Sequence, residues 1–280
     1  MIGQQPTQQR SHEADGAEWR DGIAARARPS IGGHAASVGL AIGLLVLWQV
    51  VVKLLGVPAW LLPAPTDIVS AMVANAGSLT FHGLVTLSEV LVGFALAFLV
   101  GVALAIAIAK VPVLDRALYP YVVASQTIPV IAIAPLLLFW FGYGLWPKAI
   151  VVVLISFFPI AVNTVDGFRS VDPELRNLLR TMGASPAQIF TKVELPAALP
   201  YLLSGTKVAI AVSVIGAVVG EWVGAQAGLG YYMIRAAAQF HADLVFAAIV
   251  VLSALGIGLF GLVALVERVA LRYRRAGELG

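Results

Sequence analysis

The 280-residue chain contains no cysteine, which excludes disulfides, thiolate metal sites and cysteine nucleophiles. Charged residues are also scarce: they make up 12% of the sequence, against about 25% in soluble domains. Hydrophobic residues make up 60%, which is more than one soluble core of this size can bury. The four histidines are too scattered along the chain to suggest a metal centre. The composition therefore indicates a membrane protein, and we expect no metal site.

Several functional signatures are missing as well. The sequence has no G-x-x-x-x-G-K-[ST] phosphate loop, so it cannot supply an ATP site. It also lacks clustered histidines, paired catalytic carboxylates and a nucleophile elbow, and we expect no enzyme activity. The net charge of +3 need not indicate nucleic acid, because positive residues also orient membrane proteins.

Six stretches are apolar and long enough to cross a membrane, which takes about 20 residues. They are 36–55, 83–109, 115–140, 147–168, 198–224 and 243–268. Pro120, Pro129 and Pro135 must kink or interrupt the third. The sequence thus predicts an all-α polytopic membrane protein with a transmembrane domain over 36–270. The polar residues 1–35 are expected to form a disordered cytoplasmic tail, and residues 271–280 a C-terminal one.

Lysine and arginine cluster in four segments that six spans would place on one side of the membrane. These segments are the N-terminal tail, the link after the second span, the long link after the fourth span and the C-terminus. The other side keeps only Lys53, Lys148 and Arg235. Positive residues favour the cytoplasmic side. We therefore expect a multi-pass protein of the inner (plasma) membrane with both termini in the cytoplasm.

The long link, residues 170–197, is charged and has its own helix signals. Asp172 is a good N-cap, and Pro173 suits the first helical position. An apolar stripe then recurs at helical spacing, formed by Leu175, Leu178, Leu179 and Met182. Gly183 supplies a left-handed stop.

A second short helix is predicted to begin at Ser185–Pro186 and to end at Leu195–Pro196. Its apolar residues are Ile189, Phe190 and Val193. The link therefore predicts two amphipathic helices at an angle to each other on the cytoplasmic side. They could rest on lipid headgroups, or they could insert the apolar stripe into a groove of a cytoplasmic partner.

This link resembles the EAA loop of importer-type ABC permeases, whose pattern is E-A-A-x3-G-x9-I-x-L-P. The sequence keeps Gly183, the nine-residue spacing and Leu195–Pro196, with Val193 in place of Ile and Asn177-Leu178-Leu179 in place of Glu-Ala-Ala. Three further strings look like the branch serving nitrate, taurine, alkanesulfonates and thiamine-pyrimidine or other vitamin precursors. They are SQTIPVIAIAPLLLFWFGYG, FFPIAVNTVDGFRSVDPE and GEWVGAQAGLGYYM.

The resemblance implies a homodimer placed between two cytoplasmic ATPase subunits and an external solute-binding protein. ATP and Mg²⁺ would then belong to a partner subunit, and the solute would be small and anionic or heterocyclic. An ion-coupled secondary transporter is the alternative, although its usual internal repeats are not found. The resemblance places coupling to the ATPase at Leu175, Leu178, Leu179, Met182, Gly183, Ile189, Phe190, Val193, Leu195 and Pro196.

Candidate residues for a translocation path lie within the spans. The uncharged polar ones are Gln126, Thr127, Asn163 and Thr164, and Gly216 and Gly220 begin a row of glycines four apart that continues to Gly224 and Gly228. Each could line a path or merely pack against, or hydrogen-bond to, a neighbouring helix. Glu221, at the outer end of the fifth span, could hold an outer gate, contact the binding protein or cap the structure.

Two further sets of ionisable residues lie near the ends of the predicted spans. Asp166 and Lys207 lie toward the cytoplasmic ends of the fourth and fifth spans, where they could pair. Residues 228–244 are too polar to span and are expected to be helical from about Tyr231 at the outer surface. Arg235, His241 and Asp243 there are candidate contacts for a solute-binding protein, or simply part of a solvated helix.

Overall fold

The computed structural model describes residues 31–271, and it divides into two units, residues 1–56 and 57–280. The first unit contributes one described helix, α2 (Ile31–Leu54). This helix is apolar around its whole circumference, which is typical of a helix surrounded by lipid. The remainder of the expected N-terminal tail, residues 1–30, and residues 272–280 of the expected C-terminal tail lie outside the described residues.

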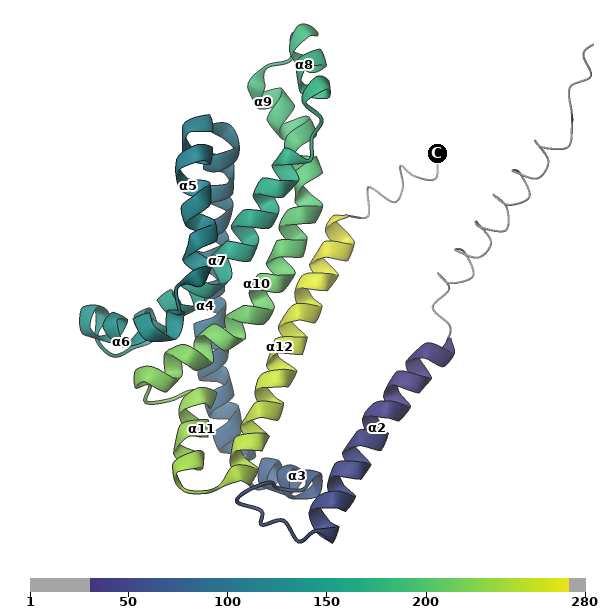
Figure 1. The fold of residues 1–280 in the computed structure, drawn as a ribbon, viewed down its shortest axis with the longest axis vertical. Coiled ribbons are helices and arrows are strands. Elements are labelled where there is room, and N and C mark those ends of the chain that lie inside the picture. The colour runs from purple at the N-terminus through teal and green to yellow at the C-terminus, as the bar shows by residue number, and fades with distance from the viewer. Residues whose placement is uncertain (1–30, 272–280) are drawn as a thin grey trace, which may run out of the picture. The chain divides into compact units, whose positions relative to one another are not determined.

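The second unit is helical throughout its described part (Figure 1). Its α-helices are α3 (Pro65–Ala74), α4 (Ala76–Lys110), α5 (Pro112–Ala124), α6 (Val130–Phe141), α7 (Leu145–Arg169), α8 (Pro173–Thr181), α9 (Pro186–Ile189), α10 (Leu195–Gly224), α11 (Leu229–Ala238) and α12 (Ala242–Ala270). A 3-10 turn, η1 (Ser125–Thr127), joins α5 to α6, and a π-helical segment, η2 (Phe190–Glu194), joins α9 to α10.

Five of the six predicted spans are confirmed as single long apolar helices. The third is different, because Pro112–Thr127 and Val130–Phe141 meet at an angle of 99°. The cause is local: Pro129 cannot donate a backbone hydrogen bond, and it pushes Ile128 into an extended conformation with φ −83° and ψ 120°. Residues 115–140 therefore form a broken span rather than one straight helix.

The second short helix of the long link does not end at Leu195–Pro196, as the sequence predicted. The chain stays helical from Pro186 to Gly224, and only the hydrogen-bond pattern changes over η2. Pro196 falls in the first turn of α10, where its missing N–H costs little. A π segment immediately before a proline lets the helix continue past it. The fifth span therefore begins about ten residues earlier than predicted.

The core of the second unit is built around α7 and α10, which make its most extensive contact. Small residues bring the two helices close. A Cβ built on Gly205 would lie 2.4 Å from the carbonyl oxygen of Pro159, and one on Gly216 or Gly220 would lie 3.1 Å from an α7 Cα atom. Gly216 and Gly220 thus pack against α7 within the subunit. Gly228 does not continue this row, because α10 ends at Gly224 and Gly228 precedes α11.

Gly205→Ala should destabilise the permease, because its new methyl group would overlap the backbone of α7. We expect a loss of about 2 kcal/mol in the free energy of unfolding, as for other overpacked interiors. Thermal unfolding of the purified chain in detergent measures the change. The control is Gly258→Ala on α12, where an added Cβ meets nothing within 4 Å and alanine favours the helix. Equal melting temperatures for the two variants would contradict close packing at Gly205.

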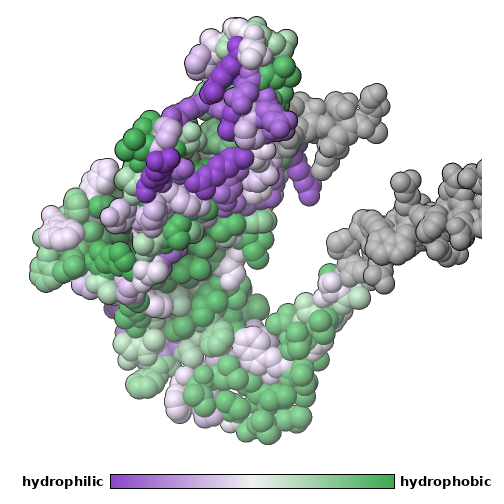
Figure 2. Space-filling model, turned by 45° about the horizontal axis from the view of Figure 1, so that its top comes forward, coloured by the Kyte–Doolittle hydropathy of each residue, from purple (hydrophilic) through white to green (hydrophobic). Residues whose placement is uncertain are grey.

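Polar residues are concentrated at one end of the second unit. Figure 2 shows hydrophilic residues gathered at the end that carries α8, whereas the body of the unit is mostly hydrophobic. In Figure 1, α8 and α9 lie at this end, and α3 and α11 lie at the other. The long apolar helices connect the two ends, as expected for a domain that spans a bilayer.

Candidate functional site

The helix α8 has the start signals that the sequence predicted. The Asp172 side chain accepts a hydrogen bond from the backbone N–H of Glu174 at 2.8 Å, and Pro173 is the first helical residue. Such a cap satisfies one of the N–H groups that a helix leaves free at its start. The predicted N-cap and first turn are confirmed.

The turn that ends α8 is confirmed as well. Gly183 has a φ of +83°, in the left-handed region that favours glycine. Its N–H donates to the carbonyl of Arg180, and the N–H of Ala184 donates to the carbonyl of Leu179, both at 3.0 Å. These two bonds form a Schellman motif. Ser185 then begins the next helix with a capping box to Gln188.

The ten residues assigned to coupling divide into two groups. Leu178 and Met182 on α8 are 56% and 73% exposed, and Leu175, Gly183 and Leu195 are exposed too. Ile189 is buried, and the partly buried side chains are Leu179, Phe190, Val193 and Pro196. The first group forms an apolar surface that nothing in the described chain covers, and the second packs against the rest of the unit.

Phe190 illustrates the inward-facing group. Its ring stacks on that of Phe168, with 5.8 Å between ring centroids, and the Lys110 ammonium lies 4.3 Å above its centroid. Removing Phe190 would therefore act on α8 indirectly, through the packing that holds the link against α4 and α7.

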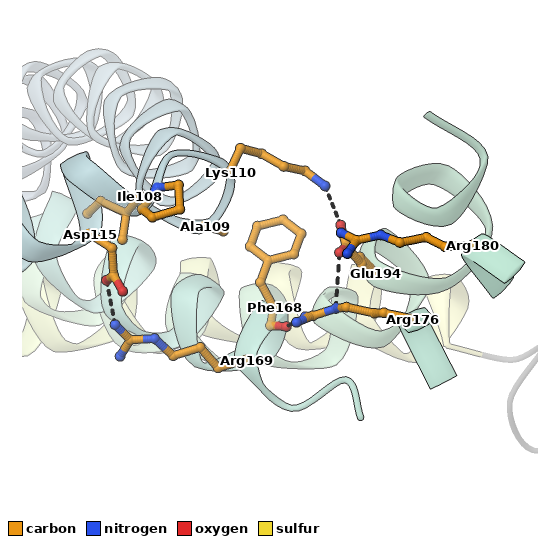
Figure 3. Close-up of a pocket in the computed structure, with 10 residues that line it drawn as sticks. Ile108, Ala109, Lys110, Asp115, Phe168, Arg169, Arg176, Arg180 and Glu194 are labelled. Carbon is orange, nitrogen blue, oxygen red and sulfur yellow. Dashed lines mark hydrogen bonds and ion pairs between the residues drawn. The ribbon is translucent and has the colours of Figure 1, made fainter. Parts of the chain in front are cut away.

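Glu194 joins α8 to the ends of the long helices. Its carboxylate accepts a hydrogen bond from Lys110, at the last position of α4, and pairs with the Arg176 Nε at 3.1 Å (Figure 3). Arg176, on α8, also donates to the carbonyl of Phe168 near the end of α7. The helix α8 is thus bonded directly to α7 and is linked to α4 through Glu194.

A second ion pair ties the same region together. Arg169, the last residue of α7, pairs with Asp115 on α5 at 2.6 Å, and its guanidinium lies 4.3 Å from the centroid of the Tyr119 ring. The ends of α4, α5 and α7 and the helix α8 therefore form one charged cluster. These pairs could not be predicted from the sequence, because their members are up to 84 residues apart.

The candidate path residues do not meet in one cavity. Gln126 and Thr127 lie exposed in the turn between α5 and α6. Asn163 donates to the carbonyl of Pro159, and Thr164 to that of Ile160, so both bond within their own helix. A path role for these residues and for Gly216 and Gly220 stays a prediction.

Glu221 on α10 is buried and accepts hydrogen bonds from two other elements, α4 and α11. The Thr86 hydroxyl donates to it at 2.6 Å, and the backbone N–H groups of Gly230 and Tyr231 also donate to it. Thr86 in turn accepts from the N–H of Leu229 at 2.8 Å. The carboxylate therefore holds the start of α11 against α4 and α10, which fits the structural cap among the three expected roles.

An ion pair that the sequence did not reveal lies close to this network. Lys148 on α7 pairs with Glu89 on α4, and the two residues are only 8% and 1% exposed. The sequence predicted Lys148 at the outer end of the fourth span and did not indicate that it is buried in an ion pair. The available signal was one charge of each sign within apolar spans, since such charges usually pair.

A cavity of about 410 Å³ borders the Lys148–Glu89 pair. Its polar lining is formed by Ser88, Glu89, Tyr143, Lys148 and Gln226. None of the candidate path residues lines it. It brings a hydroxyl, an amide, an aromatic ring and both signs of charge to one place, so it can present donors and acceptors to a small polar solute.

The three candidate binding-protein contacts lie close together at the end opposite α8 (Figure 1). Arg235 is exposed on α11 and donates to the Tyr231 hydroxyl at 3.2 Å. His241 precedes α12, and its Nδ1 lies 3.9 Å from the carboxylate of Asp243. The predicted helix between spans five and six is confirmed as α11.

The expected pair between Asp166 and Lys207 is wrong. Lys207 instead donates to Glu267 on α12 at 2.6 Å, and Asp166 is exposed. The sequence placed both residues at the right depth but could not give their rotation about α7 and α10. This pairing ties α10 to α12.

These features define a class: a polytopic helical membrane protein that presents a capped amphipathic helix at one end of its spans. The chain belongs to the family of binding-protein-dependent transport system inner membrane components, which matches residues 97–271. It is therefore the membrane-spanning permease subunit of an ABC importer and not an enzyme, as predicted. An ion-coupled secondary transporter is not favoured.

Three relatives show the breadth of this family. The chain is 43% identical to the formylaminopyrimidine transport permease protein ThiX of Halalkalibacterium halodurans, over 83% of this chain and 93% of that protein. It is 40% identical to the riboflavin transport system permease protein RibX of Chloroflexus aurantiacus, over 82% and 87%. It is 31% identical to the taurine transport system permease protein TauC of Escherichia coli, over 78% and 82%.

Two solved structures share the fold. An inward-facing structure of the MetNI methionine ABC transporter aligns with a TM-score of 0.55 at 22% identity, covering 68% of this chain and 97% of that chain. An amino acid ABC transporter with histidines aligns with a TM-score of 0.56 at 19% identity, covering 70% and 96%. At these identities the likeness shows the fold alone.

Proposed function

We propose that this permease imports a nitrogen heterocycle of the aminopyrimidine kind, a vitamin precursor, rather than a sulfonate. The relatives named for formylaminopyrimidine and riboflavin are 43% and 40% identical to it. Those named for aliphatic sulfonates and taurine are 29% to 33% identical. The cavity beside Lys148 and Glu89 supports this choice, because it offers both donors and acceptors to a heterocycle.

The ATPase binds at α8 in this proposal. The observation that carries it is the exposed apolar stripe of Leu175, Leu178 and Met182 on a helix whose polar contacts hold it to α7 and to Glu194. An amphipathic helix of this kind fits an apolar groove on a partner. Two ATPase subunits, each with ATP and Mg²⁺, would serve a homodimer of this permease.

The end that carries α8 faces the cytoplasm in this proposal. The basic residues Lys110, Arg169, Arg176, Arg180 and Lys192 lie on elements of this end. At the other end, Arg235 is the basic residue of α11. This asymmetry supports the cytoplasmic placement under the positive-inside rule. Both termini would then be cytoplasmic.

The solute-binding protein contacts the opposite end, around Arg235, His241 and Asp243. A second feature supports this surface: Phe240, between α11 and α12, has a φ of +59° and is 71% exposed. A bulky residue in that conformation is unusual and is held there by its surroundings. The Phe240 ring packs edge-on against that of Trp60, with 6.3 Å between centroids, so two exposed aromatic rings mark the contact surface.

Uptake by whole cells tests the solute. Deleting the gene should abolish most uptake of labelled formylaminopyrimidine and leave taurine uptake unchanged, because the chain is more similar to the relatives named for heterocycles than to the one named for taurine. Restoring the wild-type gene should restore uptake, which controls for effects on neighbouring genes. Loss of taurine or sulfonate uptake, with formylaminopyrimidine uptake intact, would contradict the assignment.

A further inference from the structure

A charged cavity of about 330 Å³ opens at the end that carries α8 (Figure 3). It lies between the ends of α4 and α7, the start of α5, and α8. Four basic side chains line it but only two acidic ones: Lys110, Arg169, Arg176 and Arg180, with Asp115 and Glu194. Because long apolar helices end here, the cavity lies at the depth where lipid headgroups meet the spans.

The ion pairs inside the cavity do not neutralise all of its positive charge. Asp115 pairs with Arg169, and Glu194 is shared by Lys110 and Arg176. The guanidinium of Arg180 has no ion-pair or hydrogen-bond partner among residues 31–271. Figure 3 shows the Arg180 side chain extending toward Glu194 from the side opposite to Lys110. The unpaired Arg180 guanidinium and the Lys110 ammonium thus line the same cavity.

The lining suits a phosphate group on an apolar anchor. A guanidinium can bind a phosphate through two parallel hydrogen bonds, and a lysine adds a point charge. Apolar surface is added to the lining by Ile108, Pro112 and Phe168. A free anion would leave this apolar surface uncovered, whereas the glycerol and first acyl carbons of a lipid would cover it.

We propose that this cavity binds the phosphate group of an anionic phospholipid, with Arg180 as its main contact. Basic pockets between spans on the cytoplasmic side are known to take anionic headgroups. The choice of the cytoplasmic leaflet rests on the orientation proposed above. Binding itself does not, because a nanodisc offers both leaflets to the protein.

The test measures lipid retained by the full-length permease. The protein is placed in nanodiscs of phosphatidylglycerol and phosphatidylcholine in equal amounts, and bound lipid is counted by native mass spectrometry. Wild type should retain phosphatidylglycerol preferentially, and Arg180→Gln should lower that preference about fivefold, the factor for one basic side chain near an anionic surface. Arg180→Lys should keep part of it.

Arg116→Gln is the matched control. Arg116 is exposed on α5 at the same end but does not line the cavity, so the preference should stay at the wild-type level. An equal loss in Arg116→Gln and Arg180→Gln would overturn the proposal, because it would indicate diffuse attraction to the membrane surface. Unchanged retention in Arg180→Gln would overturn it too.

Two further arms identify other occupants. Inorganic phosphate, added to nanodiscs of phosphatidylcholine alone, should not raise the melting temperature of the wild type. A rise that depends on Arg180 would show a site for a free anion instead of a lipid. If Arg180→Gln keeps its lipid but loses co-purifying ATPase, the cavity serves an acidic side chain of that partner, and the lipid proposal fails.

Discussion

Lys148→Met should destabilise the permease more than any other single change considered for this chain. Lys148 pairs with Glu89 between α7 and α4, and both side chains are almost completely buried. Removing one partner leaves the other charge buried and unpaired, which typically costs about 3–5 kcal/mol. For a domain of this size that corresponds to a fall of roughly 6–20 °C in the melting temperature, which thermal unfolding in detergent measures.

The double variant Lys148→Met with Glu89→Gln separates burial of a lone charge from loss of packing. It removes both charges and keeps the shape of the glutamate, so it should recover most of the lost stability. Lys192→Met is the control, because Lys192 is exposed and its loss should change stability by less than about 0.5 kcal/mol. If Lys148→Met and Lys192→Met had the same melting temperature, an unpaired Glu89 would carry no burial penalty.

Leu178→Ala should weaken binding of the ATPase about 30-fold while leaving the permease folded and in the membrane. Leu178 is exposed on α8, in the stripe assigned to docking. An apolar anchor that becomes buried at an interface contributes about 2 kcal/mol, which is about a 30-fold change in affinity. Co-purification of the ATPase, normalised to the permease present in the membrane, measures the effect.

Gly183→Val should reduce co-purification as well, for a different reason. Valine at a φ of +83° costs about 1–2 kcal/mol, so the turn would relax and α8 would tilt away from its partner. Leu262→Ala on α12 is the matched control, because Leu262 is 61% exposed on a different helix. Wild-type assembly of Leu178→Ala and Gly183→Val would refute docking at α8 and favour the lipid-resting alternative.

The sequence predicted best the features that depend on residues close together in the chain. Asp172, Pro173 and Gly183 are separate start and stop signals, and each is used in the structure as expected. Five of the six spans could also be predicted, because each is a long apolar run. Pro129 predicted an interruption of the third span. The size of the bend, 99°, could not be predicted, because it depends on how α6 packs against the other helices.

Ion pairs between residues far apart in the chain could not be predicted from the sequence. Lys207 pairs with Glu267 and not with Asp166, because the rotation of each helix about its axis decides which charge it faces. For the same reason, the position of Lys148 at the outer end of the fourth span did not reveal that its side chain is buried against Glu89. Gly228 broke the row of glycines because α10 ends four residues before it, so a spacing of four along the sequence was not a spacing along one helix.

The continuity of the helix from Pro186 to Gly224 has a mechanical consequence. Its 39 residues form one continuous, curved helix with a path roughly 58 Å long at 1.5 Å per residue. One end lies beside α8, and the other is close to Glu221, which holds the start of α11 against α4 and α10. A lever of this length turns a tilt of a few degrees into a displacement of several ångströms. ATPase closure at one face of the membrane would thereby shift the surface offered to the binding protein at the other, without bending any span.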